Sequence, residues 1–339
     1  MKEYGIYTLA NDAVHDQLIA LINSIEANVE KEIPICVIPY DNQLSLVNQV
    51  IAERPNVTLF DKQESLQRWE KFAKDIWATH PQVLENRFKK ATYPLGHHRK
   101  FVAFDGEFKK FVFYDADSLA MKPLSNVFEK LDRYDLVFDD WEHKKQDKST
   151  ALKLDLVEKN SSLQREYVRS KLHCSSFFGS RSSLLNDIEL LRLKNHLIKD
   201  QEIKWIRRSW DDAFLFNYLT LRAEYSTFNF TLSSNSQDRT GNCADSDPFI
   251  ELNGILYNQD GKKAIHRIHY MNYPSKYFKD LAEGKDRSVA YKNIFLYYRF
   301  YKEPQNRPKT LQYSNLMVKG KVIFEKAAKK LSGILRSAS

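Results

Sequence analysis

The sequence predicts an α/β fold, in which a mostly parallel central sheet is flanked by helices. In the first 140 residues, apolar segments of strand length alternate with longer segments whose apolar residues recur at helical spacing. Such alternation requires crossover connections, which join parallel strands. Acidic residues recur at the ends of the predicted strands, at Asp12, Asp41, Asp61 and Asp115. Since ligands of parallel sheets bind beyond the carboxyl ends of the strands, we expect a polar cleft there.

The predicted elements of the first half follow one another as strand and helix. Strand-like segments cover residues 4–9, 33–41, 56–61 and 111–114. Helical segments cover 14–25, a stretch between the second and third strands, 64–78, and a basic segment that starts near 97. In 14–25 (VHDQLIALINSI), the apolar positions lie on one face of a helix.

The second half is less regular. Residues 142–170 are charged and free of glycine and proline, so we expect a helical or mobile insertion. Further predicted elements are a strand at 173–180, helices at 182–197 and 211–222, and a late strand at 264–271. Residues 232–248 form a polar loop. With 339 residues, 42% of them hydrophobic, the chain can bury a large core, and we find neither an internal repeat nor a clear domain boundary.

The positive charge is concentrated at the C-terminus. Of the net charge of +8, residues 318–339 contribute five, from six basic residues against Glu325. Ile323, Ala327, Leu331 and Leu335 recur every four residues, which predicts a basic amphipathic helix. Such a helix suits an anionic membrane surface, and it could equally pack on the body of the protein. A nucleic-acid binder would distribute its charge more evenly, so we expect no nucleic-acid partner.

Several features favour the cytoplasm. The N-terminal residues MKEYGIYTLAND do not resemble a signal peptide, and no apolar stretch approaches the length of a spanning helix. The three cysteines, Cys36, Cys174 and Cys243, lie far apart and form no CxxC pair, which indicates a reducing compartment. We expect a cytoplasmic protein, either soluble or peripheral on the inner face of the membrane.

The segment FVFYDADSL contains the strongest functional signal. Asp115 and Asp117 follow a buried strand at positions i and i+2, where both carboxylates can reach one cation. Oxygen ligands suit Mn²⁺ or Mg²⁺, which can neutralise the charge of a departing diphosphate. A bare DxD also arises by chance, and the apolar strand before it is what favours the functional interpretation.

With this motif in place, the chain from its N-terminus to about residue 280 resembles GT-A glycosyltransferases, the family of glycogenin and the bacterial lipopolysaccharide galactosyltransferases. The resemblance implies Mn²⁺ at Asp115 and Asp117, and a nucleotide beside the first strand, YTLAND. The implied nucleotide- and sugar-binding residues are Thr8, Asn11, Asp12, Asp41, Arg99, Lys100, Ser176 and Lys276. Arg99 and Lys100 could instead lie on a solvated helical face.

Three later segments extend the resemblance. HCSSFFGS is similar to the family's Asn-Ala-Gly strand beside the sugar, although Cys174 and Ser176 replace the Asn and Gly. WDDAFLFNYL resembles the helix start that faces the transferred sugar, which implies catalytic roles for Asp211 and Asp212; a helix N-cap explains one of them equally well.

HRIHYMNYPSK resembles the family's His-x-x-Gly-x-x-Lys-Pro-Trp segment. This similarity implies that His269 is the third metal ligand, with His266 as the fallback, and that Lys276 reaches the diphosphate. The segment departs from the pattern, since Asn272 stands in place of the glycine and the Pro-Trp is missing. A lone histidine in an apolar strand can also be a hydrogen-bonded core residue.

The resemblance implies a hexosyltransferase that moves a sugar from a nucleoside diphosphate donor, expected to be a UDP-sugar, to a hydroxyl of a glycan or lipid-linked glycan, with retention. It divides the chain into a nucleotide-binding half (1–140), a sugar- and acceptor-binding half (141–310) and a basic tail (311–339). One alternative is a haloacid dehalogenase-like phosphohydrolase that uses Asp115 and Asp117. That class places its nucleophile on the first strand, whereas several strand–helix units precede this one. A second alternative is an inactive, basic, membrane-associated protein.

Overall fold

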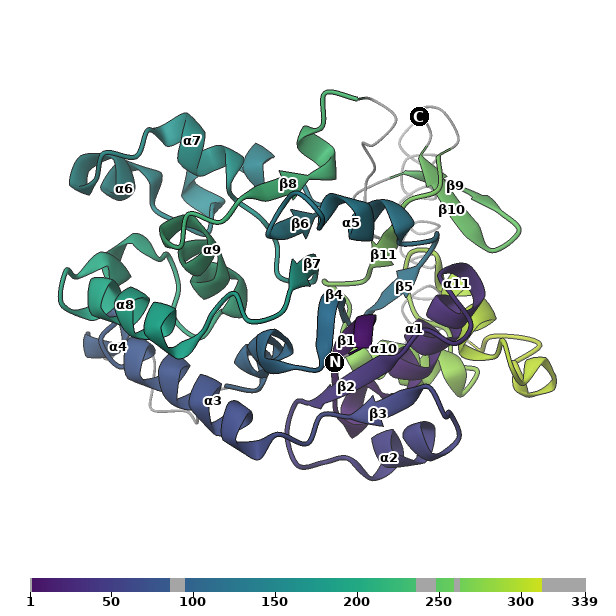
Figure 1. Ribbon diagram of the computed structural model, residues 1–339. Helices are drawn as coiled ribbons and strands as arrows, with labels where there is room; N and C mark the ends of the chain where they lie inside the picture. Colours follow the sequence, from purple (N-terminus) through teal and green to yellow (C-terminus); the bar gives the residue numbers. More distant parts are fainter. Residues whose placement is uncertain (1, 86–94, 236–247, 259–262, 313–339) are drawn as a thin grey trace, which may run out of the picture.

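The computed structural model describes residues 2–85, 95–235, 248–258 and 263–312 (Figure 1). Its main sheet has the strand order β3-β2-β1-β4-β7-β6-β8. The strands are β1 (Lys2–Ala10), β2 (Ile35–Pro39), β3 (Val57–Leu59), β4 (Phe108–Asp115), β6 (Leu136–Phe138), β7 (Phe177–Arg181) and β8 (Thr227–Asn229). All neighbouring pairs are parallel except those that involve β7, which is antiparallel to β4 and β6. The prediction of a mostly parallel sheet is therefore confirmed.

Helices cover both faces of this sheet (Figure 1). On β1, Tyr7 and Leu9 join one core cluster and Ile6 and Ala10 join the other, because alternate side chains of a strand point to opposite faces. The first cluster includes residues of α3 (Gln63–Trp77), α8 (Asp187–Ile198) and α9 (Asp212–Arg222). The second includes residues of α1 (His15–Asn28), α2 (Ser45–Ala52) and α5 (Ser125–Lys130).

A small antiparallel sheet lies beyond the end of β4. It consists of β5 (Ser118–Ala120) and β11 (Arg267–His269), in which Ser118 pairs with His269 and Ala120 with Arg267. Leu119 and Ile268 lie on the opposite face of this small sheet from Ser118 and His269. They pack in a third cluster with residues of α10 (Ser275–Ala282) and α11 (Lys292–Arg299). A hairpin of β9 (Phe249–Leu252) and β10 (Ile255–Asn258) contributes Leu256 to that cluster. The small sheet therefore brings a late segment of the chain beside the DxD.

Three predicted elements differ from the structure. The basic helix is η2 (Leu95–Asp105), a 3₁₀ helix, and most of its residues from His98 to Phe104 are buried. Its residues lack the one-sided apolar spacing that favours an amphipathic α-helix. The strand predicted at 173–180 begins only at Phe177, because the backbone N–H groups of His173 and Cys174 donate to the side chains of Asn217 and Asp140 instead of a neighbouring strand. The strand predicted at 264–271 is shortened to the three residues that pair with β5.

The helical interpretation of 142–170 is confirmed. This segment contains the short helices η3 (Glu142–Lys144), η4 (Asp147–Ser149), α6 (Leu154–Asn160) and α7 (Arg165–Ser170). The remaining helical elements are η1 (Asp12–Val14), α4 (Pro81–Leu84), η5 (Glu202–Trp205), η6 (Phe230–Leu232) and η7 (Pro304–Asn306). Most of the polar loop at 232–248 and the tail at 318–339 lie outside the described residues.

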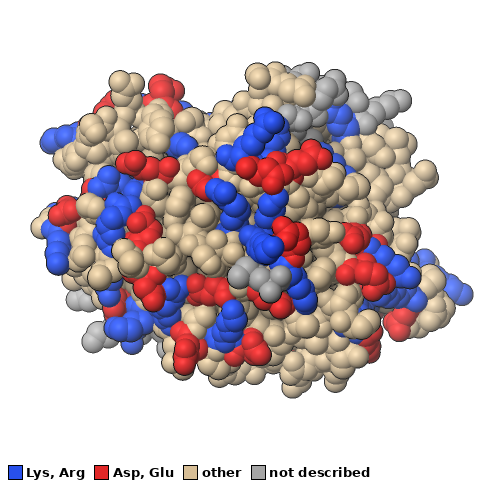
Figure 2. Space-filling view, viewed as in Figure 1, with Lys and Arg blue, Asp and Glu red and all other residues tan. Residues whose placement is uncertain are grey.

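Charge is mixed on the face of the molecule that Figure 2 shows, where basic and acidic side chains are interspersed. Exposed ion pairs occur in the described chain, for example between Lys109 Nζ and Glu3 Oε2 at 2.8 Å. None of the helices in the described ranges is long and apolar enough to cross a membrane.

Candidate active site

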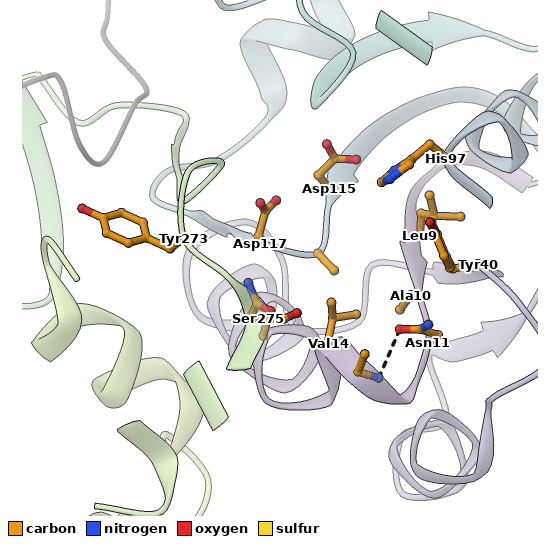
Figure 3. A pocket seen from close by; sticks show the side chains of 13 residues that line it. Leu9, Ala10, Asn11, Val14, Tyr40, His97, Asp115, Asp117, Tyr273 and Ser275 are labelled. Atoms are coloured by element: carbon orange, nitrogen blue, oxygen red, sulfur yellow. Dashed lines mark hydrogen bonds between the residues drawn. The ribbon is translucent and has the colours of Figure 1, made fainter. Parts of the chain in front are cut away.

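The candidate site lies at the carboxyl ends of β1 and β4, as the pattern of acidic strand ends predicted. Leu9 of β1 is the register partner of Asp115, the last residue of β4. The turn from β4 into β5 then places Ala116 and Asp117 beside the same edge. Figure 3 shows both carboxylates at the rim of a cavity that also receives residues of the loops after β1 and β2.

Asp115, Asp117 and His269 form a cluster that could hold a metal ion. One potential ligand atom from each residue lies within 4.8 Å of the others. The Nε2 atom of His269 lies 3.3 Å from Oδ1 of Asp117. Burial raises the pKa of Asp117, but the neighbouring imidazole of His269, together with Lys100 and Arg267, outweighs burial and lowers this pKa below its ordinary value. Two carboxylates and an imidazole suit a first-row divalent cation such as Mn²⁺.

Lys100 joins this cluster to the start of α9. Its Nζ lies 3.0 Å from Oδ1 of Asp115 and 2.7 Å from Oδ2 of Asp212, and its side chain is only 2% exposed. Burial alone would lower the pKa of Lys100, but the two carboxylates raise it above its ordinary value. The Nζ is also 3.3 Å from the Ser175 hydroxyl, and that hydroxyl donates to Asp212. Lys100 is therefore a fixed buried cation, not part of a solvated helical face.

The two adjacent aspartates at the start of α9 have different surroundings. Asp211 is the N-cap of the helix, and its carboxylate accepts the backbone N–H groups of Ala213 and Phe214 at 3.0 and 3.4 Å. Asp212 instead faces Lys100. Burial raises the pKa of Asp212, but Lys100 together with His97 and His98 outweighs burial, and the pKa lies well below its ordinary value. Asp212 is thus ionised, whereas Asp211 caps the helix.

A cavity of about 300 Å³ opens beside the DxD. Asn11 lines it, and the Asn11 amide donates to Oδ2 of Asp41 at 2.8 Å. Tyr40, at the end of β2, and His97, on η2, form one side, with ring centroids 5.0 Å apart in an edge-on arrangement. Tyr273 and Ser275, which precede and begin α10, form part of the remaining lining (Figure 3).

Other predicted nucleotide-binding residues lie near this cavity without lining it. Thr8 is fully buried, and its Oγ1 has no hydrogen-bond partner among the described residues. The carboxylate of Asp12 accepts backbone N–H groups at the start of α2, including that of Leu46 at 2.9 Å. Arg99 donates to Glu70 at 2.6 Å and to the carbonyl of Pro39 at 3.0 Å. Thr8, Asp12 and Arg99 therefore belong to the structure that surrounds the cavity and do not line it.

The candidates from later segments are dispersed. The Ser176 hydroxyl accepts a hydrogen bond from Arg267 at 3.1 Å. Ser176 lies close to the DxD, because its backbone carbonyl accepts the N–H of Asp115 at 2.8 Å. Lys276 is 70% exposed and pairs with Asp280 at 2.7 Å. His266, the fallback ligand, is fully buried, and its Nδ1 lies 2.9 Å from Oδ2 of Asp139. Of the two histidines, only His269 faces the DxD.

Several residues of the site were not predicted, among them the four residues Tyr40, His97, Ser175 and Arg267. Each lies within two residues of a predicted one. Arg267 and His269 stand at positions i and i+2 of β11 and so point to the same face, a spacing that was available in the sequence. For Tyr40 and Ser175, the sequence offers no comparable signal, because their place depends on how distant segments pack.

Comparison with solved structures shows that this arrangement is the GT-A fold of glycosyltransferases. The bifunctional glycosyltransferase WbbM, in its apo form, aligns with a TM-score of 0.52 at 14% identity, over 91% of this chain and 52% of that one. This chain thus spans about half the length of the WbbM structure. The galactosyltransferase LgtC, solved with donor and acceptor sugar analogues, gives a TM-score of 0.48 at 12% identity, over 81% of this chain and 94% of LgtC.

A third similar structure is mouse xyloside xylosyltransferase 1, with a TM-score of 0.45 at 8% identity, over 67% of this chain and 84% of that one. No protein-family model matches the sequence, and no curated protein sequence matches it. The GT-A fold leaves the phosphohydrolase alternative without support, because that class places the acidic nucleophile on the first strand of a different fold. Here the DxD follows β4, after three strand–helix units.

Proposed function

We propose that this protein is a metal-dependent hexosyltransferase that moves a sugar from a UDP-sugar to a hydroxyl of a glycan or lipid-linked glycan. One observation supports this proposal above all. His269 comes together with Asp115 and Asp117, from which it is distant in sequence, and the two aspartates line a cavity at the edge of a GT-A fold where ligands bind. This cavity is large enough for part of a nucleotide, and the carboxyl ends of parallel strands are where such ligands bind.

Asp115, Asp117 and His269 would hold Mn²⁺, or Mg²⁺ in its place. When bound, the ion neutralises the negative charge that develops on the departing diphosphate. The imidazole of His269 favours Mn²⁺, because Mg²⁺ prefers oxygen ligands. Lys100 occupies one oxygen of Asp115, which leaves the other oxygen of that carboxylate for the ion.

Asp212 would lie beside the transferred sugar and stabilise positive charge at its anomeric carbon. Lys100 and Ser175 hold this carboxylate in place, so it need not reorganise as charge develops. Its lowered pKa makes it a weak base. A weak base is poorly suited to taking the acceptor proton, as inversion would require, and better suited to electrostatic stabilisation. This argument favours retention. Asp211 contributes by fixing the start of α9.

The nucleotide would occupy the cavity between β1, β2 and η2. The Tyr40 ring offers an apolar surface for a base, and the Asn11–Asp41 pair offers a donor and an acceptor for the polar edge of uracil. Thr8, Asp12 and Arg99 would hold the lining residues of this cavity in place without contacting the nucleotide. Lys276, which is exposed, would turn from Asp280 toward the diphosphate, and Ser176 would face the sugar.

We further propose that the half of the chain from 141 to 310 receives the acceptor, and that residues 318–339 attach the protein to the inner face of a membrane. The basic amphipathic pattern of that tail supports membrane attachment. A lipid-linked acceptor would make such attachment useful, since enzyme and acceptor would then share one surface. A role in the synthesis of a polysaccharide would follow.

Calorimetric titration of UDP, with and without Mn²⁺, tests the proposal on the wild-type protein and on Asp117→Ala. We expect binding that depends on Mn²⁺ and is lost in Asp117→Ala. Asp132→Ala is the matched control, because Asp132 is 64% exposed and pairs with Lys110 instead of a residue of the candidate metal site. If UDP, GDP and CMP all fail to bind under both conditions, the proposal is wrong. Hydrolysis of p-nitrophenyl phosphate that depends on Asp115 would favour a phosphohydrolase instead.

A further inference from the structure

The residue immediately before the aspartate pair has an unusual backbone. Trp210 has φ of 63°, in the left-handed region that bulky side chains rarely adopt. Asp211 follows as the N-cap of α9, and Asp212 is the first residue of that helix. A conformation of this kind persists only where the surrounding structure fixes it, and it is frequent at functional sites. The contacts of Trp210 therefore bear on the position of Asp212.

The Trp210 ring packs against Trp77 of α3, with ring centroids 6.3 Å apart and planes at 71°. Trp77 is fully buried, and its indole Nε1 donates to Nε2 of His98 at 2.9 Å. Burial lowers the pKa of His98 to about 4, so its ring is neutral and can accept this hydrogen bond at physiological pH. His98 lies on η2, two residues before Lys100.

These contacts close a ring that returns to the candidate catalytic carboxylate. Trp210 touches Trp77, Trp77 bonds to His98, and η2 carries both His98 and Lys100. The Nζ of Lys100 lies 2.7 Å from Asp212, which is two residues after Trp210. Lys100 is thus linked to Trp210 through η2 and Trp77, and Asp212 is linked to Trp210 through the backbone.

We infer that Trp210 is a positioning residue, which fixes the place of Asp212 relative to Lys100 through its packing on Trp77. The inference rests on the proposed function, in which Asp212 faces the transferred sugar. The proposed metal ligands lie on the DxD turn and β11, and the proposed nucleotide cavity is lined mainly by residues around the ends of β1 and β2, with His97 as its contribution from η2. Loss of the Trp210 ring should therefore impair the chemical step and spare nucleotide binding, because small misplacements of a catalytic group are costly to rate.

Trp210→Gly is the informative substitution, since glycine adopts this φ without strain and only the ring is lost. We expect kcat to fall about tenfold or more, with the Kd of UDP–Mn²⁺ within about twofold of the wild-type value. Trp210→Phe should recover most of the rate. Trp77→Phe, which keeps a ring but removes the donor to His98, should show a smaller loss of kcat. Trp205→Phe is the control, because Trp205, like Trp77, is buried and packs on Tyr218 outside this ring of contacts.

A structural measurement separates this inference from the proposed function. The indole N–H signal of Trp77 in the NMR spectrum, assigned by its disappearance in Trp77→Phe, reports the bond to His98. We expect it to shift in Trp210→Gly and to stay unchanged in Trp205→Phe. An unshifted signal, an unchanged kcat, or equal losses of kcat and UDP affinity in Trp210→Gly would overturn the inference. Failure of the wild-type protein to bind any nucleotide would overturn the proposed function while the signal still tests the contact.

Discussion

The Nζ atom of Lys100 lies 2.7 Å from Oδ2 of Asp212, and both side chains are largely buried. The same Nζ is 3.0 Å from Oδ1 of Asp115. One lysine therefore balances a carboxylate of the candidate metal site and the carboxylate that we place beside the sugar. Because a buried charge is stable only when it is paired, this lysine should matter for both folding and activity.

Replacement of Lys100 by Met should leave two neighbouring buried carboxylates without their cation. We expect the free energy of unfolding, measured in denaturant without metal, to fall by about 3–5 kcal/mol. Turnover should fall by about a hundredfold or more, since a preorganised charge is lost. Lys109→Met is the control, because Lys109 is 56% exposed and pairs with Glu3 on the surface. Equal effects of the two substitutions would argue against a special role for Lys100.

His269→Ala should weaken Mn²⁺ binding, because it removes one of the three potential protein ligands. We expect the Kd of Mn²⁺, measured by calorimetry or by paramagnetic broadening, to rise by a factor of about ten or more. His266→Gln should keep the Mn²⁺ affinity and lower the melting temperature, because His266 is buried against Asp139. The opposite pattern, in which only His266→Gln loses Mn²⁺, would show that the fallback residue is the ligand.

Tyr40→Ala should weaken nucleotide binding if the Tyr40 ring supports the base. Stacking of a base on an aromatic ring contributes about 1–3 kcal/mol, which corresponds to a rise in Kd for UDP of roughly fivefold or more. Tyr40→Phe should bind UDP nearly as well as the wild type, because it keeps the ring. Binding of inorganic diphosphate with Mn²⁺ should be unaffected in both variants. If Tyr40→Ala binds UDP normally, the base lies elsewhere in the cavity.

Stability should depend on pH through Asp140, a buried residue at the end of β6. Burial, with a contribution from Glu142, raises the pKa of its carboxyl from 3.8 to about 7. Between these values the folded protein binds more protons than the unfolded chain, so the stability that this group contributes falls as pH rises. The slope should reach at most about 1.4 kcal/mol per pH unit.

Denaturant unfolding of the wild type and of Asp140→Asn at pH 4.5, 5.5, 6.5 and 7.5 measures this contribution. Because asparagine cannot ionise, we expect the difference in unfolding free energy between the two proteins to move steadily in favour of Asp140→Asn as pH rises. The exposed substitution Asp132→Asn should give a smaller change. A difference that is independent of pH across this range would show that Asp140 does not titrate there.

The sequence by itself determined the alternation of strands and helices in the first half of the chain, the mostly parallel sheet and the edge of that sheet at which the candidate site lies. These follow from local pattern, since apolar spacing decides which segment is strand or helix and buried strands read as continuous apolar runs. The DxD was equally visible, because Asp115 and Asp117 are neighbours and need no distant partner. The ends of the elements were predicted less well than their order. For example, β7 starts later than predicted, because the side chains of Asp140 and Asn217 accept hydrogen bonds from backbone N–H groups that would otherwise extend the strand.

Only the tertiary structure decided which polar residues meet. Lys100 and Arg99 are adjacent in sequence, yet one is buried between two carboxylates and the other bonds to Glu70, because adjacent residues of a helix point in different directions. Likewise, the pairing of β11 with β5 brings His269 to Asp117, whereas His266 meets Asp139. Such contacts join segments up to about 150 residues apart, from Asp117 to His269, and local spacing holds no information about distances of that kind.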